Sequence, residues 1–243
     1  MLTELMLVIA VAAIALVAGV LAAVAGFGGA VILLPVLVLA FGVRDAIPIL
    51  TVAQLIGNLS RVWFNRGELA FPVVGWFALG AVPAATLGGI VFATAPAAAL
   101  VRLLGVFLVC MVAYRHTTWG QRARITLRGF LPLGATAGFI SALVGSVGPF
   151  MAPFFLTYGL VKGAYIGTEA LSTVVMHVIK LGVYGGYSLL SARTFLVGIG
   201  IGAVLFFASY LGKRILDRVP ERVFPYLVEG VMITAGVVFV IRG

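Results

Sequence analysis

Charged residues and cysteine are scarce in this sequence. Of 243 residues, 16 are Lys or Arg and 7 are Asp or Glu. The charged fraction of 9% is far below the roughly 25% of a soluble globular domain, which excludes a soluble fold. The one cysteine, Cys110, excludes an intrachain disulfide and a cysteine metal cluster. Segments of alternating polarity, which a transmembrane strand barrel needs, are also missing.

The sequence has instead apolar runs close to the ~20 residues that cross ~30 Å of hydrocarbon. Each half of the chain has five of them: residues 3–24, 30–41, 46–64, 71–92 and 96–114, then 129–144, 149–160, 164–187, 194–212 and 223–241. The second run of each half is short, and about 12 residues make only ~18 Å of helix. These two runs should therefore be re-entrant, strongly tilted or half of a broken helix. The predicted fold is an all-α polytopic membrane protein with about 8 full spans and two short helices.

The two halves repeat one another at an offset of 118 residues, which places Pro35 on Pro153, Arg44 on Lys162 and Thr51 on Glu169. We therefore divide the chain into a first transmembrane repeat, a linker and a second repeat. These cover residues 1–114, 115–128 and 129–243. Because each half has an odd number of segments, the second should enter the membrane from the opposite side. This is the inverted repeat that recurs in secondary transporters.

Much of the net charge of +9 lies in two clusters, residues 115–128 and 213–222. In a membrane protein such clusters mark cytoplasmic loops, so both are predicted on the cytoplasmic side. Nucleic-acid binding is the weaker explanation, because no soluble domain is predicted that could offer a basic face.

Two breaks rich in small residues precede the short segments. They contain Gly26, Gly28 and Gly29 in the first half and Gly145, Ser146 and Gly148 in the second. Glycine allows a sharp turn and leaves backbone N–H groups free to point into a cavity. The helix that follows offers its positive N-terminal end to an anion. The alternative is close helix packing through small residues, but two equivalent breaks, each before a short segment, favour a substrate site.

Polar side chains line one face of the long segment that follows each break. They are Thr51, Gln54, Asn58 and Arg61 in the first half and Glu169, Thr173, His177 and Lys180 in the second. Each set spans an arc of about 80° on a helix. Ionisable residues cost about 2.5 to 3.5 kcal/mol each to insert into a membrane, which makes them functional candidates. The alternative is that Lys180 and Arg61 reach an interface and that Glu169 pairs with a basic neighbour.

We predict that the substrate is bound by the two breaks, by the polar face of the first half, and by Ser172 and Lys180. Glu169 and His177 are predicted to carry a coupled proton, because an imidazole changes its protonation near neutral pH. His177 is one of only two histidines and has no cysteine or carboxylate at ligand spacing. Neither a metal nor another cofactor is therefore predicted.

The stretches GFGGAVILLPVL and GSVGPFMAPFFLTYGLVKGAYIGTEAL resemble the sulfite exporter TauE/SafE family of membrane proteins. The family pattern is a glycine cluster, a short apolar stretch and a proline, and the resemblance extends over nearly the whole chain. The sequence departs from it at Ala30, where a third glycine is usual, and at Ser146, Val147 and Pro149. The resemblance implies transport of sulfite or small organosulfonates, generally outward across the cytoplasmic membrane.

The predicted function is that of a secondary transporter and not of an enzyme. It is a multi-pass protein of the bacterial inner membrane, alone or as a homodimer, that exports a small sulfur oxyanion by alternating access. The alternatives are a passive anion channel, a membrane-embedded enzyme and an assembly subunit. A channel would not accumulate substrate against its gradient. An enzyme would need a nucleophile with its base or a metal set, and the ionisable residues of the second half are too generic to establish one.

Overall fold

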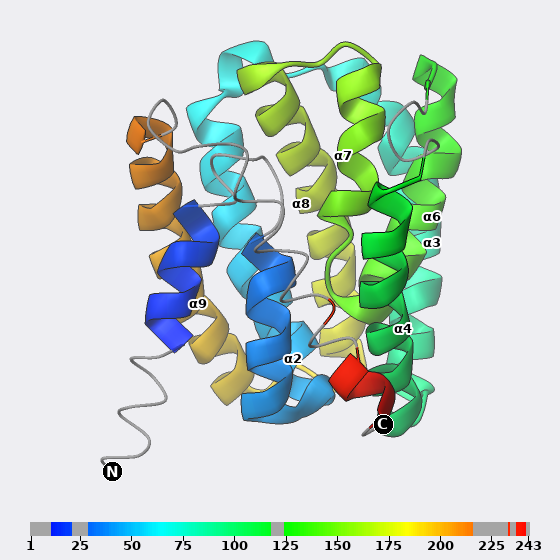
Figure 1. Ribbon diagram of the computed structural model, residues 1–243, viewed down its shortest axis with the longest axis vertical. Helices are drawn as coiled ribbons and strands as arrows, with labels where there is room; N and C mark the ends of the chain where they lie inside the picture. Colours follow the sequence, from blue (N-terminus) through cyan, green and yellow to red (C-terminus); the bar gives the residue numbers. More distant parts are fainter. Residues whose placement is uncertain (1–10, 21–28, 118–123, 216–232, 234–236, 242–243) are drawn as a thin grey trace.

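The computed structural model describes residues 11–20, 29–117, 124–215, 233 and 237–241. In this part of the chain every regular element is a helix (Figure 1). The elements are Val11–Val20, α2 (Gly29–Phe64), η1 (Arg66–Glu68), α3 (Phe71–Thr94), α4 (Ala97–Arg115), η2 (Leu127–Gly129), α6 (Phe130–Val144), α7 (Gly148–Thr157), α8 (Lys162–Gly186) and α9 (Ala192–Ile215). The prediction of an all-α fold is thus confirmed for the described residues.

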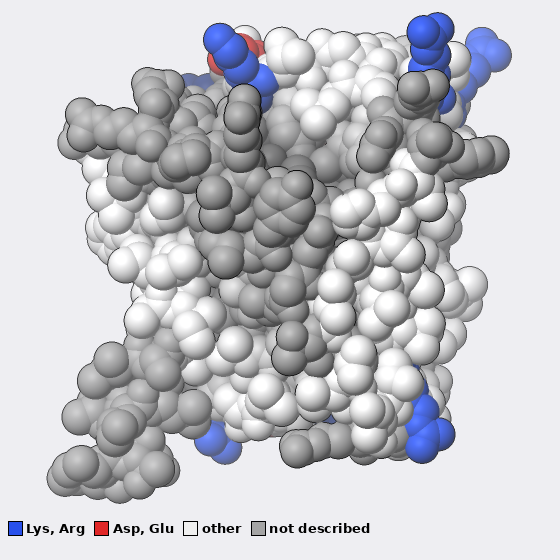
Figure 2. Space-filling view, viewed as in Figure 1, with Lys and Arg blue, Asp and Glu red and all other residues white. Residues whose placement is uncertain are grey.

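Six helical stretches among the described residues are long and apolar enough to cross a membrane. Large apolar side chains such as Leu79, Leu196 and Phe207 are more than half exposed on α3 and α9, as expected for surfaces that face lipid. On the face shown in Figure 2, Lys and Arg gather at the two ends of the long axis, and the described residues visible between them are uncharged. The chain is therefore a multi-pass membrane protein. Most of the predicted segments 3–24 and 223–241 lies outside the described residues.

Helix α2 is broken at Gly42. The φ and ψ angles of this residue are 74° and 160°, a conformation that glycine adopts without steric cost. The helical parts on its two sides correspond to the predicted runs 30–41 and 46–64. Gly29 and Asn58, which lie on opposite sides of Gly42 in the chain, come together in the structure, so the chain reverses at Gly42. The short first run is therefore a re-entrant segment that lies beside the second part of α2.

Arg44 attaches this break to the end of α3. Its guanidinium donates hydrogen bonds to the carbonyls of Phe92 (3.3 Å), Ala93 (2.8 Å) and Ala95, and it lies 5.9 Å from the centre of the Phe92 ring. A cation in this position satisfies carbonyls that have no partner within the helix and complements the negative end of the helix. The break in α2 and the end of α3 therefore lie at the same end of the molecule.

A second break separates α6 from α7. Helix α6 ends at Val144, and Gly145 has a φ of 84°, in the left-handed region that favours glycine. Helix α7 begins at Gly148 and has 10 residues, so it is ~15 Å long and too short to cross a bilayer. The short segment predicted for residues 149–160 is confirmed.

Helices α3 and α6 touch through their backbones. A Cβ added to Gly80 would lie 2.0 Å from the carbonyl oxygen of Leu131, and one added to Gly134 would lie 2.1 Å from that of Phe77. Small residues allow this approach, as is common between membrane helices. Helix α3 also packs on α8, and α9 packs on α2. The two halves of the sequence are thus interleaved in space.

Replacing Gly134 by alanine should lower the free energy of unfolding by about 1 to 3 kcal/mol, because the two backbones would have to separate. The measurement is the Tm of the protein purified in detergent. Gly75→Ala is the matched control, since nothing lies within 4 Å of a Cβ at that position of α3. Equal Tm values for the two variants would show that α3 and α6 are not in backbone contact.

Candidate functional site

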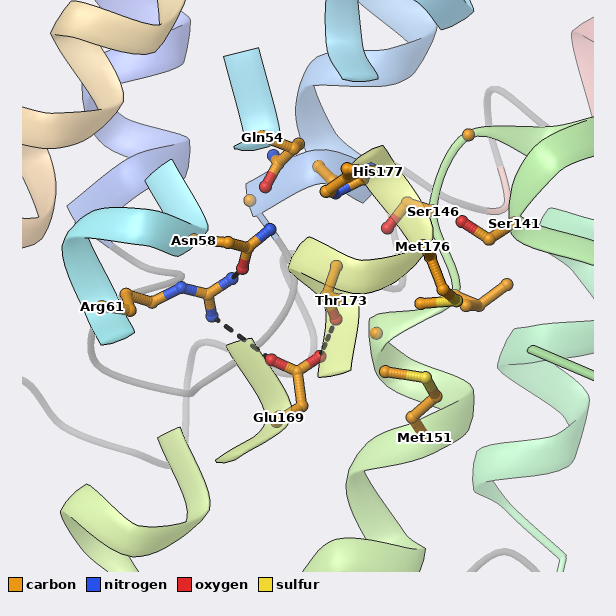
Figure 3. Close-up of a pocket in the computed structure, with 15 residues that line it drawn as sticks. Gln54, Asn58, Arg61, Ser141, Ser146, Met151, Glu169, Thr173, Met176 and His177 are labelled. Carbon is orange, nitrogen blue, oxygen red and sulfur yellow. Dashed lines mark hydrogen bonds and ion pairs between the residues drawn. The ribbon is translucent and has the colours of Figure 1, made fainter. Parts of the chain in front are cut away.

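A cavity lies between α2, α8 and the break that joins α6 to α7, with about 420 Å³ of empty space including its open mouth (Figure 3). It is lined by Gly29, Ala30, Gln54, Asn58, Arg61, Ser141, Gly145, Ser146, Val147, Gly148, Met151, Glu169, Thr173, Met176 and His177. The lining thus comes from both halves of the sequence, and the polar faces of α2 and α8 meet there.

Helix α2 contributes Gln54, Asn58 and Arg61, whose spacings of four and three residues place them on one face. All three are buried. The guanidinium of Arg61 donates a hydrogen bond to Asn58 Oδ1. The same group forms an ion pair with Glu169 of α8, with Arg61 Nη1 3.7 Å from Glu169 Oε2. This pair joins the two helices across the cavity.

Helix α8 contributes Glu169, Thr173 and His177, which recur every four residues. Thr173 Oγ1 donates a hydrogen bond of 3.3 Å to Glu169 Oε1, so the hydroxyl and Arg61 together hold the carboxylate. The expected alternative that Glu169 pairs with a basic neighbour is realised, with Arg61 as the partner. Because a buried charge without a partner is costly, removal of either partner should destabilise the junction of α2 and α8.

The N-terminal end of α7 faces the cavity. The lining includes Gly148, the first residue of α7, and residues 145–147 of the second break, together with Gly29, the first described residue of α2. A helix N-terminus carries a partial positive charge of about half an elementary charge. The predicted site residues Gly26 and Gly28 lie outside the described residues.

Two buried nitrogen atoms of cavity residues lack a hydrogen-bond partner among the described residues. They are Asn58 Nδ2 and His177 Nδ1, on side chains that are 1% and 2% exposed. Glu169 Oε2 also accepts no hydrogen bond there, although it is paired with Arg61. A buried donor without a partner costs about 1 to 3 kcal/mol. The free Asn58 N–H is therefore positioned for an acceptor in the cavity, such as an oxyanion.

Three predicted site residues lie outside the cavity lining. Thr51 Oγ1 donates to the carbonyl of Ile47 (2.7 Å) and Ser172 Oγ to that of Thr168 (2.9 Å), each in its own helix. Both hydroxyls thus have their hydrogen-bond acceptor within their own helix. Lys180 is fully buried, which rules out the alternative in which it reaches an interface. Its ammonium donates to the end of α6.

The lining also includes residues that were not predicted as site residues: Ala30, Ser141, Val147, Met151, Thr173 and Met176. Thr173 shares the polar arc of α8, and Ser141 is a polar residue one turn before Gly145, so the sequence contains a weak indication that both belong to the site. It contains no such indication for the methionines, because apolar residues are expected throughout such helices. No three His, Cys, Asp or Glu side chains come together as metal ligands within the described residues.

A multi-pass helical protein with a buried polar cavity between broken helices has the architecture of a membrane transporter. The sequence profile described as "Sulfite exporter TauE/SafE" matches residues 11–239, and the chain belongs to this family. Comparisons with curated proteins and with solved structures give no match. The resemblance read from the sequence is confirmed. Membership indicates a membrane exporter of a sulfur anion.

Replacing Arg61 by glutamine should lower the free energy of unfolding by about 3 to 5 kcal/mol, because Glu169 would remain as a buried charge without its partner. The double variant Arg61→Gln/Glu169→Gln should regain part of this loss. Tm measurements on the purified variants test the pair, with Arg66→Gln as control because Arg66 lies against the ring of Trp63 and not in the cavity. Strictly additive effects would show that Arg61 and Glu169 are not coupled.

Proposed function

We propose that the protein exports a small sulfur oxyanion or organosulfonate, such as sulfite, across the bacterial inner membrane by alternating access. The substrate binds in the cavity between α2, α8 and the second break. The observation that carries this proposal is the buried Asn58 N–H without a partner, beside the guanidinium of Arg61 in the same cavity. The family supports an anion that contains sulfur.

The charges around the cavity favour an anion. Glu169 is the one carboxylate among the lining residues, and its charge is offset by Arg61. The N-terminal end of α7 and the Asn58 N–H then remain to bind oxygen atoms of the substrate. An SO₃ group offers three such oxygens, which can bind several donors at once. The methionines on the lining leave an apolar side for the sulfur atom or for an organic substituent.

An inverted repeat is supported by the positions of equivalent residues. Arg44 binds the end of α3, whereas Lys162, its equivalent at an offset of 118 residues, begins α8 next to η1, where a Cβ on Gly163 would meet Glu68. The second part of α2 and its equivalent α8 thus run in opposite directions. The packing of α3 on α8 likewise has its counterpart in that of α9 on α2.

The interleaved packing supports alternating access. Helix α9 packs on α2, and α3 packs on α6 and α8, and these two groups meet where α2 packs on α8. The cavity lies at this junction. Rocking of one group against the other would open the cavity to one side of the membrane and then to the other. The Arg61–Glu169 pair connects the groups. If the anion replaced Glu169 as the partner of Arg61, this connection would be broken. Binding of the anion would then itself trigger the rocking movement.

Asn58→Asp should abolish anion binding, because the swap replaces a free donor by a carboxylate of the same shape. Wild-type protein at a sulfite concentration 100 times its Kd should be stabilised by about 2.7 kcal/mol, and the variant should show no such gain in a thermal-shift titration. Asn65→Asp is the control, since it makes the same change directly after the end of α2, outside the lining. An undiminished sulfite shift in Asn58→Asp would place the anion elsewhere.

His177→Gln should leave substrate binding largely intact and flatten the pH dependence of transport into proteoliposomes, because glutamine cannot change its protonation near neutral pH as an imidazole does. Glu169→Gln should do the same if the two residues share that proton. His116→Gln is the control, as the second histidine lies at the exposed end of α4. Unchanged pH profiles in both cavity variants would argue against a proton path. Uptake that never exceeds equilibrium would instead indicate a passive channel.

A further inference from the structure

The second break brings helix ends of opposite sign to the cavity. Ser141 and Gly145 belong to the last turn and the C-cap of α6, and Gly148 is the first residue of α7. All three line the cavity. A helix end carries about half an elementary charge, positive at the N-terminus and negative at the C-terminus. An anion in the cavity is therefore attracted by α7 and repelled by α6.

Lys180 binds the C-terminal end of α6, which is the end that repels an anion. Its ammonium Nζ donates to the carbonyl of Ser141 (3.2 Å), to Ser141 Oγ (3.1 Å) and to the carbonyl of Gly145 (3.2 Å). An ammonium has three N–H donors and no acceptor, so three acceptors match it fully. One turn later on α8, the Tyr184 hydroxyl donates to the carbonyl of Ala142 (2.6 Å). Helix α8 thus binds most of the last turn of α6.

The charge of Lys180 has no acidic partner within the described residues. Glu169 is the carboxylate on the same polar face, but it is paired with Arg61. It also lies 11 positions earlier, which is ~16 Å along the helix axis. Lys180 is 0% exposed, so water does not screen its charge. Its field therefore acts on the end of α6 and on the cavity next to it.

We propose that Lys180 is a positioning residue for the anion that acts through α6. It cancels the negative end of this helix, holds residues 145–148 against the cavity, and makes binding stronger for a doubly charged anion than for a singly charged one. This inference rests on the proposed function, since it assumes that the cavity binds an anion. It assigns to Lys180 an electrostatic role without direct contact to the substrate.

Thiosulfate and methanesulfonate test the charge dependence, because they share an SO₃ group and carry two charges and one. Isothermal titration of the purified full chain gives the Kd of each for wild type, Lys180→Gln and Lys180→Met. Since electrostatic energy is proportional to the charge of the ligand, a loss of about 10-fold for methanesulfonate should become about 100-fold for thiosulfate. Lys180→Arg should keep the wild-type ratio of the two Kd values. Tyr184→Phe, which removes a neutral hydrogen bond to the same turn, should affect both anions equally.

Equal losses for the two anions in the neutral variants would mean that Lys180 only stabilises the fold, and would overturn the inference while leaving the proposed function intact. The same conclusion holds if neither neutral variant folds although Lys180→Arg does. Absence of binding of both anions and of sulfite to wild type would instead contradict the proposed function itself.

Discussion

A helix that ends inside an apolar environment leaves up to four carbonyl groups without partners, and no water is present to satisfy them. At the end of α6 this chain meets that requirement with a buried cation, since Lys180 donates to the carbonyls of Ser141 and Gly145. Arg44 does the same for the last carbonyls of α3, at the end of the molecule where α2 is interrupted. The second break, which lines the cavity, therefore depends on the contact of Lys180.

The same requirement explains how a polar site can exist among apolar helices. Arg61 and Glu169 offset each other across the junction of α2 and α8, and the hydroxyls of Thr51 and Ser172 bind within their own helices. What remains without a partner in the described part of the lining is then a small set of atoms, chiefly Asn58 Nδ2 and His177 Nδ1. A binding site for a small polar ligand should contain few such atoms, because each one lowers the stability of the folded protein until a ligand binds to it.

Much of the fold was predictable because length and periodicity are local properties. The short segments, the second break and the polar arcs of α2 and α8 were all predicted from spacing alone. The role of Lys180 was not predictable, because it depends on how closely the end of α6 approaches α8, which is a property of the tertiary structure. Nor could spacing show that Arg61, and not Lys180, is the partner of Glu169. Met151 and Met176 gave no signal, since an apolar residue in such helices is equally compatible with lipid, core or cavity.

The interleaving of the two halves also has a consequence for how the protein is made. Helix α3 ends at Thr94, but the helix that fits its glycine face begins only at Phe130. During synthesis, α3 and α4 therefore enter the membrane before α6 exists, and the face of α3 that will touch another backbone is first covered by lipid. The cavity cannot form before α8 is made, because α8 supplies Glu169, Thr173 and His177 of its lining. A chain that stopped before α6 would leave the glycine face of α3 without its partner helix.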